Sequence, residues 1–178
     1  MSLLTYNALR EFVDNGHLRN VEERHINPAS IDVRLADDFM IENASRPGIV
    51  DLSEKRAPNM VRAHSDEGTI TLHPGEVMLA STIEYFDMPN DVAGLFVLKS
   101  TPSRAFLTNM HSGWIDPGFN GSPLTMQLKN TLQYSCLRLK AGMPIGQIVF
   151  WRGEDVPAEL SYAARGSYNQ RDGVGLPQ

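Results

Sequence analysis

The stretch from Val97 to Asn130 decides the fold, and it reads VLKSTPSRAFLTNMHSGWIDPGFNGSPLTMQLKN. It places hydroxyl groups, cations, glycines and one acid between two apolar runs that are typical of strands. Asp116 follows a short apolar segment and precedes a Pro-Gly turn, and Phe119 comes directly after that turn. We expect the carboxylate of Asp116 to lie at the end of a strand, beside an aromatic side chain.

The first part of this stretch predicts a short helix. Ser100 or Thr101 can cap it, with Pro102 at the first helical position, where the missing N–H costs nothing. The start of a helix leaves backbone N–H groups free, and Lys99 and Arg104 add positive charge beside them. The pattern predicts a site for phosphate or another anion near Asp116.

Outward from this stretch the chain reads as many short strands separated by Gly, Pro and Asn turns. This pattern predicts a single domain over 1–178 that is mostly β, a distorted barrel or jelly roll with little helix. The expected strands are Ile31–Leu35, Phe39–Ile41, Ile49–Leu52, Ile70–Leu72, Val77–Ala80, Val92–Leu98, Leu124–Leu128, Leu137–Leu139 and Ile145–Phe150.

The remaining segments carry less chemistry. Apolar residues at helical spacing predict an amphipathic helix within Leu3–Leu18, which ends at Asn15-Gly16. Glu54–Gly68 is polar and reads as a surface loop. The polar, Gly-rich segment 152–178 predicts a mobile C-terminal tail. The single cysteine, Cys136, is expected to be a buried apolar residue.

Composition and missing motifs exclude several function classes. A net charge of −5 argues against nonspecific nucleic-acid binding. The chain has no apolar run long enough to cross a bilayer and no signal-peptide pattern, so we expect a cytoplasmic protein. It lacks the H-x-E and P-C-x-x-C motifs of zinc deaminases, and its five histidines are scattered, so no zinc site is expected. No phosphate-loop or dinucleotide fingerprint is present.

Five motifs in order resemble the dCTP deaminase branch of the dUTPase superfamily, and the resemblance covers nearly the whole chain. It implies a dUTPase-like fold and an enzyme that converts dCTP and water to dUTP and ammonia. The motifs are ERHINPASIDVRL at 23–35, VDLS at 50–53, LHPGE at 72–76, KSTPSRA with WIDPGFNG within 99–121, and GMPIGQIVF at 142–150.

The resemblance also implies roles for the residues of the central stretch. Ser100 would orient the nucleotide or the attacking water. Lys99 and Arg104 would contact phosphate or another charged group, together with Thr101. Lys99 stands where the deaminases usually carry arginine. A lysine offers a point charge in place of bidentate contacts. Asp116 would contact the sugar 3′-hydroxyl and, in the dUTPase members, orient the hydrolytic water.

Further implications concern the sugar, the tail and the assembly. Phe119 would pack against deoxyribose and leave little room for a 2′-hydroxyl. Tyr168 and Gln170 would belong to a tail that folds over the triphosphate as a lid. The resemblance implies Mg²⁺ bound through the nucleotide, with no metal ligand expected from the protein. It also implies a homotrimer whose sites are shared between neighbouring chains.

One position departs from the family pattern. The deaminases carry a catalytic glutamate three residues before the asparagine that ends the strand after the I-D-P-G motif. Counting back from Asn130 gives Gln127, whereas counting forward from Asp116 gives Met126, because this chain has one extra residue. Glutamine can hydrogen-bond a water but cannot take its proton. Deamination should therefore be severely impaired if it needs that glutamate.

Three functions stay open at this point. The first is a dCTP deaminase in which another group supplies the base. The second is a dUTP diphosphatase, in which Asp116 directs water at the α-phosphorus, a task that needs no glutamate. The third is a nucleotide-binding protein without turnover. Overall resemblance favours the first, and the chemistry of Gln127 favours the other two.

Overall fold

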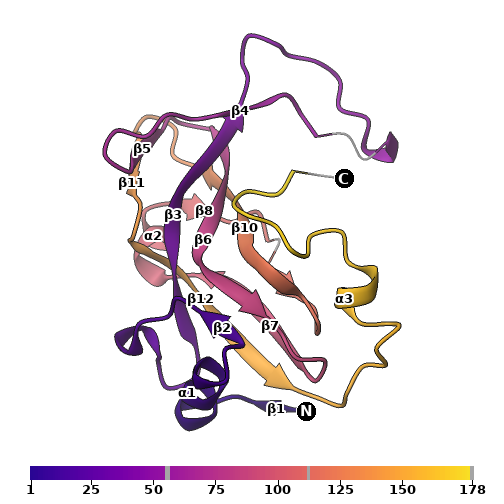
Figure 1. The fold of residues 1–178 in the computed structure, drawn as a ribbon. Helices are drawn as coiled ribbons and strands as arrows, with labels where there is room; N and C mark the ends of the chain where they lie inside the picture. The colour runs from indigo at the N-terminus through magenta and orange to yellow at the C-terminus, as the bar shows by residue number, and fades with distance from the viewer. Residues whose placement is uncertain (55–56, 112, 177–178) are drawn as a thin grey trace.

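The computed structural model describes residues 1–54, 57–111 and 113–176, and strands dominate this part of the chain. An antiparallel sheet curls into a half-barrel in the order β8-β10-β6-β3-β12-β7-β9, with β1 on β12, β2 on β6 and β4 on β3 (Figure 1). β5 and β11 form a separate pair. The predicted mostly-β, barrel-like fold is confirmed. The strands are β1 (Ser2–Leu3), β2 (Leu18–Arg19), β3 (Ile31–Glu42), β4 (Met60–Arg62), β5 (Thr69–Leu72), β6 (Val77–Asp87), β7 (Val92–Leu98), β8 (Leu107–Thr108), β9 (Trp114–Ile115), β10 (Asn120–Asn130), β11 (Leu137–Lys140) and β12 (Pro144–Arg152).

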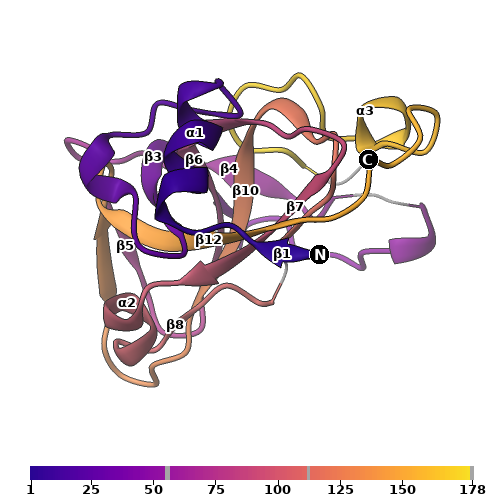
Figure 2. The same cartoon turned by 90° about the horizontal axis from the view of Figure 1, so that it is seen from below.

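The helices are few and short, as the sequence predicts. α1 (Tyr6–Asp14) lies close to β12 (Figure 2). It buries Leu9 and Phe12, and the Phe12 ring centroid lies 4.8 Å from that of Phe150 in β12. Asn15 caps its end and is followed by Gly16 with a φ of 79°, the left-handed conformation that glycine adopts readily. The others are α2 (Ser100–Arg104), α3 (Tyr162–Arg165) and the 3₁₀ turns η1 (Glu23–His25) and η2 (Leu52–Glu54).

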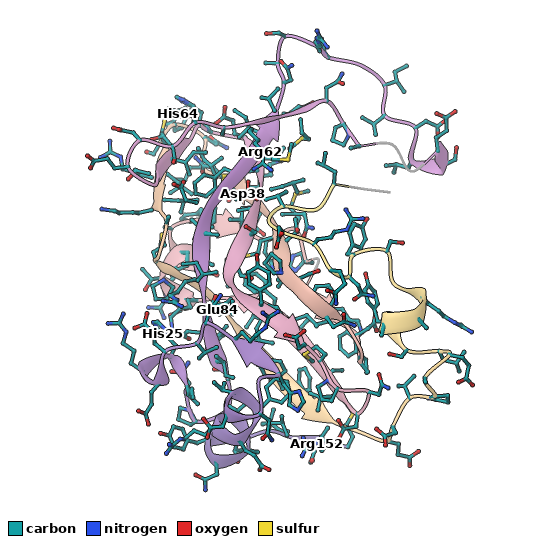
Figure 3. The ribbon with its side chains drawn as sticks, viewed as in Figure 1. His25, Asp38, Arg62, His64, Glu84 and Arg152 are labelled. Carbon is teal, nitrogen blue, oxygen red and sulfur yellow. The ribbon has the colours of Figure 1, made fainter. Side chains whose placement is uncertain are left out.

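One buried ion pair lies inside the sheet. The side chain of Glu84 in β6 is fully buried, and it accepts hydrogen bonds from the backbone N–H (2.8 Å) and Nε (2.7 Å) of Arg34 in β3. Burial raises the pKa of Glu84, and the bonds from Arg34 oppose that rise. Removing one partner of such a pair costs about 3–5 kcal/mol of stability, because it leaves a buried charge. The pair therefore links β3 to β6, and Figure 3 labels Glu84 at this place in the sheet.

Two predictions of elements were wrong in detail. Ile31–Leu35 and Phe39–Ile41 belong to one strand, β3, because the polar residues between them form an irregularity in its pairing with β6 and not a turn. Ile49–Leu52 is not a strand. It lies in an excursion away from the sheet, where Ile49 is 101% and Leu52 83% exposed (Figure 1). β4 instead forms within the segment predicted as a loop.

Cys136 is exposed, so its predicted burial was wrong. It lies in the bend before β11, and its Sγ is 3.4 Å from Nδ1 of His73. The alternating pattern that suggested burial begins only at Leu137. No helix in the described part of the chain has the length and apolar character needed to cross a membrane.

Candidate functional site

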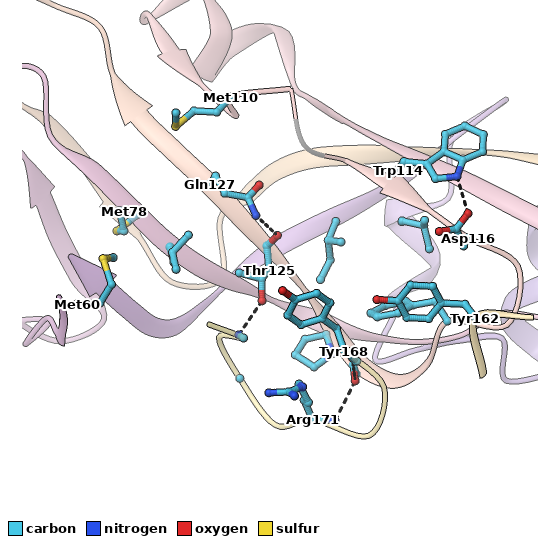
Figure 4. A pocket seen from close by; sticks show the side chains of 18 of the residues that line it. Met60, Met78, Met110, Trp114, Asp116, Thr125, Gln127, Tyr162, Tyr168 and Arg171 are labelled. Atoms are coloured by element: carbon cyan, nitrogen blue, oxygen red, sulfur yellow. Dashed lines mark hydrogen bonds between the residues drawn. The ribbon is translucent and has the colours of Figure 1, made fainter. Parts of the chain in front are cut away.

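A pocket of about 510 Å³ opens between the sheet and the C-terminal segment (Figure 4). Its floor comes from β6 and β10, one side from β9 and the turn after it, and the other side from α3 and the chain that follows α3. Most of its surface is apolar, including three methionines, with a few polar groups among them, as is common for small-molecule sites. The polar and aromatic residues that line it include Trp114, Asp116, Phe119, Thr125, Gln127, Tyr162, Tyr168 and Arg171.

The carboxylate in this pocket belongs to Asp116. Ile115 is buried and pairs with Gly94 of β7, so the chain leaves β9 with Asp116 exposed to the pocket. Gly118 turns the chain with a φ of 85°, and the Phe119 N–H donates to the Asp116 carbonyl at 3.2 Å. The indole N–H of Trp114 donates to Oδ1 of Asp116 at 2.8 Å (Figure 4). One carboxylate oxygen is thus held, and the other can meet a ligand.

The structure resolves which residue stands in the pocket near the end of β10. Gln127 lines the pocket, whereas Met126 is only 1% exposed and packs in the core. The pairing of β10 with β6 is irregular between Asn120 and Ser122 and between Pro123 and Thr125. Of the two positions that the sequence offered, Gln127 is the one that faces the pocket.

The Gln127 amide is incompletely bonded. Its Nε2 donates to the Thr125 carbonyl at a long 3.4 Å, and its Oε1 is buried without a partner among the described residues. A buried acceptor without a partner costs about 1–3 kcal/mol. Such an atom inside a pocket is ready to accept a hydrogen bond from a ligand.

Phe119 is 8% exposed and contributes one face of its ring to the pocket. Its ring centroid lies 6.0 Å from that of Phe86 in the core and 5.6 Å from that of Tyr162 in α3. The residue is therefore both part of the core and part of the pocket wall.

The C-terminal segment forms the remaining wall. Ser122 Oγ donates to the Tyr168 carbonyl at 2.8 Å and accepts from the Arg171 N–H at 2.9 Å. Gln170 donates through its side chain to Oδ1 of Asn120. Tyr168 lines the pocket, and Gln170 lies beside it. The segment forms one wall of the pocket, and its role as a mobile lid over a triphosphate stays a prediction.

The tail continues to the far edge of the pocket through two further bonds. The Gly175 N–H donates to Oγ1 of Thr125 at 2.9 Å, and the Val174 N–H donates to Oδ2 of Asp38 at 2.6 Å. Asp38 also pairs with Arg62 of β4 (Figure 3). The tail is therefore tied to β10, β3 and β4.

The sequence reasoning missed five polar or aromatic pocket residues: Trp114, Ser122, Thr125, Tyr162 and Arg171. Trp114 stands two residues before Asp116, so its proximity to the carboxylate was available from the local sequence. Tyr162 and Arg171 come from the tail, and only the path of the tail brings them here. Arg171 supplies a cation to the pocket wall, where its guanidinium lies 5.5 Å from the Tyr168 ring centroid.

The predicted cationic cluster lies elsewhere in the same chain. Gly94 of β7 pairs next to the Asp116 corner, and β7 then runs about 13 Å to Leu98 before α2 begins. α2 and α3 lie on opposite sides of the molecule in Figures 1 and 2. The expectation that the helix start and Asp116 meet is therefore wrong within a single chain. The residues concerned are Lys99, Ser100, Thr101 and Arg104.

The helix start also differs in detail from the prediction. Lys99 is the N-cap residue, Ser100 is the first helical residue, and Pro102 is the third. Lys99 Nζ is 2.6 Å from Oδ2 of Asp32 in β3, whose Oδ1 accepts from Asn27 at 2.8 Å. Lys99 is thus paired, whereas Ser100, Thr101 and Arg104 are exposed.

Comparison with known proteins adds to this geometry. The profile of the family described as dCTP deaminase-like matches residues 3–153. A protein named "dCTP deaminase, dUMP-forming" from Acidothermus cellulolyticus is 41% identical over 143 residues, 78% of this chain and 72% of its own length. A protein of the same name from Corynebacterium glutamicum is 35% identical over 167 residues, 91% of this chain and 86% of its own.

A solved structure shows the same fold. The crystal structure of 2′-deoxycytidine 5′-triphosphate deaminase from Agrobacterium tumefaciens matches with a TM-score of 0.65 and 22% sequence identity. The match covers 85% of this chain and 48% of that one, so this chain spans about half the length of that protein.

Proposed function

This chain belongs to the dCTP deaminase-like family, and from that premise we propose that it is a hydrolase of pyrimidine deoxynucleotides that forms dUMP. Its main reaction is the release of pyrophosphate from dUTP, and its deamination of dCTP is slow. One observation carries this choice. Among the described residues that line the pocket, Asp116 is the sole carboxylate, and Gln127 offers a neutral amide.

The amide of Gln127 limits chemistry at the base. Deamination requires a water that loses a proton as it attacks C4 and a group that passes protons to the departing ammonia. Glutamine can donate and accept hydrogen bonds but exchanges no proton at neutral pH. A positioned general base contributes about 10²- to 10⁴-fold to a rate, so we expect deamination to be slower by that factor.

The amide suits recognition of the base better than it suits catalysis. A uracil ring can donate N3–H to the free Oε1 of Gln127 and accept at O4 from Nε2. A cytosine ring can make the complementary pair after the amide rotates. The buried, unpaired Oε1 supports this role, because a ligand would satisfy it.

Chemistry at the triphosphate needs positioning and charge. Asp116, held by Trp114, would orient a water toward the α-phosphorus, and pyrophosphate would leave with its charge stabilised by cations. Arg171, which lines the pocket, would supply one such cation. The substrate would be the Mg²⁺ complex of the nucleotide, in which phosphate oxygens bind the ion and neutralise charge. Among the described residues, no group of three or more His, Cys, Asp or Glu side chains could hold a metal ion.

We further propose that the active form is a homotrimer with shared sites. The exposed face of α2 carries Ser100, Thr101 and Arg104, and the neighbouring Phe106 is 61% exposed. A second copy that set this face at the pocket would bring hydroxyl and guanidinium groups to the triphosphate and cover the aromatic ring. Head-to-tail contacts of this kind form a closed ring when the rotation between neighbouring copies closes, and a trimer is such a ring.

The name shared by the relatives favours a second candidate, which is deamination of dCTP as the first step toward dUMP. In that case a water on Gln127 would have to give its proton to another group.

The test is to incubate the protein with Mg²⁺ and either dCTP or dUTP, and to follow ammonia, pyrophosphate and dUMP separately. The proposal expects pyrophosphate and dUMP from dUTP and slow ammonia release from dCTP. Rapid ammonia release from dCTP would favour the second candidate. Tight binding of both nucleotides without product would show a binding protein and refute both enzymatic functions.

A further inference from the structure

α3 is docked on the corner that carries Asp116. The Tyr162 N–H donates to the Pro117 carbonyl at 3.1 Å, and Oγ of Ser161 donates to Oδ1 of Asn90 at 2.7 Å. A Cβ atom at Gly118 would overlap the Ser161 hydroxyl, so only glycine permits this approach. The first residue of α3 is thereby fixed relative to the turn between Asp116 and Phe119.

The Tyr162 side chain then packs on Phe119. The two rings meet edge to face, at 5.6 Å between centroids and an interplanar angle of 73°. A Cβ atom at Gly166 would overlap the Tyr162 ring, so the glycine after α3 leaves the space that this ring occupies. Phe119 has Phe86 on its core side and Tyr162 on the side of the tail, and both Phe119 and Tyr162 line the pocket. Figure 4 shows the Tyr162 ring in the pocket wall.

We propose that Tyr162 is a positioning residue that sets the preference of the pocket for deoxyribose over ribose by holding the Phe119 ring against the sugar. This inference rests on the proposed function and on the role that the family resemblance implies for Phe119, whose ring would face C2′ of the nucleotide. A ribose would press its 2′-hydroxyl on an apolar ring without a hydrogen-bond partner. If Tyr162 is absent, Phe119 can turn away and admit that hydroxyl.

The size of the effect follows from two limits. An apolar pocket rejects an added hydroxyl by about 10²-fold at most. A pair of aromatic rings contributes about two- to tenfold beyond the area it buries. Loss of the Tyr162 ring should therefore lower the preference for deoxyribose over ribose about two- to tenfold, and the remaining preference should persist.

The experiment measures binding of the α,β-imido analogues of dUTP and UTP, with Mg²⁺, by calorimetry. The variants are Tyr162→Ala, Tyr162→Leu and Tyr162→Phe, and the matched control is Tyr134→Ala, because Tyr134 is 92% exposed and outside the pocket. We expect the ratio of the two affinities to fall about two- to tenfold in the Ala and Leu variants. The ratio should not change in the Phe variant or in the control.

Three outcomes would overturn the inference. An unchanged ratio in a folded Ala or Leu variant would show that Tyr162 does not set the preference. A loss in the Phe variant equal to that in the Ala variant would assign the effect to the hydroxyl and not to the ring. Absence of binding of both analogues to the unmodified protein would refute the proposed function itself, and this inference with it. A purely structural role would lower the melting temperature without changing the ratio.

Discussion

The identity of one side chain, Gln127, controls what the pocket can do to a pyrimidine ring. Gln127→Glu would place a carboxylate where Oε1 is now buried, and burial would raise the pKa of that carboxylate toward neutral pH, where a general base works best. We expect ammonia release from dCTP to rise about 10²- to 10⁴-fold. The measurement is the initial rate of ammonia formation at neutral pH.

Gln127→Ala is the control for this change, because it removes the amide without adding a base. It should leave ammonia release at its low starting level and weaken nucleotide binding. If the Glu variant folds and binds dCTP but releases ammonia no faster, the missing acid is not what limits deamination in this pocket.

Asp116 is the residue on which pyrophosphate release should depend. Asp116→Asn keeps an oxygen that can accept from the Trp114 indole, so the side chain should stay in place while its charge is lost. We expect the rate of dUMP formation from dUTP to fall about 10²-fold or more, with binding of the imido analogue nearly unchanged. Trp114→Phe is the control, since it frees the carboxylate without removing it and should cost less. Unchanged turnover in the Asn variant would exclude a catalytic role for Asp116.

Local sequence was sufficient to find some of these residues and insufficient for others. Asp116, Phe119 and Gln127 belong to one strand-turn-strand segment, so their spacing alone places them together. Lys99 was predicted to be an unpaired cation. Its partner Asp32 lies 67 positions away in the sequence, so no local pattern indicates the ion pair. Tyr162 reaches the pocket only through the path of the tail, which is a tertiary feature.

Among the elements, the C-terminal segment has the most direct effect on access to the pocket. Its Val174 N–H bonds to the charged Oδ2 of Asp38, and hydrogen bonds to charged groups are stronger than neutral ones. Asp38→Asn should therefore loosen the tail and raise KM for dUTP about three- to tenfold with little change in kcat. Asp37→Asn is the matched control, because exposed Asp37 bonds to Ser65 and not to the tail. Equal KM values in the two variants would mean that this bond does not hold the lid.

The η1 turn gives the fold a dependence on pH. His25 is 6% exposed, and burial and then the nearby Arg34 guanidinium lower its pKa below the ordinary 6.5. Below pH 6.5 the unfolded chain therefore takes up a proton before the folded chain does, so stability falls as the pH drops toward the lower folded value. Above pH 6.5 both states are neutral at this residue and it contributes no slope.

Urea unfolding at pH 7.5 and pH 5.5 checks this expectation. His25→Gln should lose less stability than the unmodified protein between these two pH values, whereas His64→Gln, at an exposed position, should behave like the unmodified protein. The raised pKa of Glu84 increases stability at low pH, because protonation relieves the cost of burying its charge. This effect is the same in all three proteins, so it cancels when they are compared. An equal loss of stability in all three proteins between pH 7.5 and pH 5.5 would show that His25 does not cause the dependence on pH.

The elements that the sequence predicted well are those with strong alternation, such as β7 and β12, where burial on one face dictates the pattern. Ile49–Leu52 has the apolar residues of a strand but lacks a neighbouring strand to pair with, so it stays outside the sheet. β4 has three residues and is largely exposed, and it is a strand only because the end of β3 offers it hydrogen bonds. Pairing partners are set by the whole fold, so these two segments could not be assigned from their own residues.

At the scale of the whole molecule, the chain holds two groups of polar residues that do not meet, and the proposed homotrimer treats them as two halves of one site. The pocket has the carboxylate, the amide and the aromatic wall, and the far end of β7 has the exposed hydroxyls and guanidinium of α2. A rigid strand separates them, so no side-chain movement within one copy can join them. Association of copies is the arrangement that would make both halves useful.

Mixing two inactive variants tests this arrangement. Arg104→Ala damages the α2 half and Asp116→Asn damages the pocket half, so each variant alone should form dUMP from dUTP slowly. If neighbouring copies share sites in a trimer, each mixed trimer should hold one site with both groups intact, which is about a third of its sites, and activity should recover in proportion. The measurement is dUMP formation by hetero-oligomers purified through two different tags. Mixed oligomers that stay as inactive as their parents would show that Arg104 and Asp116 do not act in the same site.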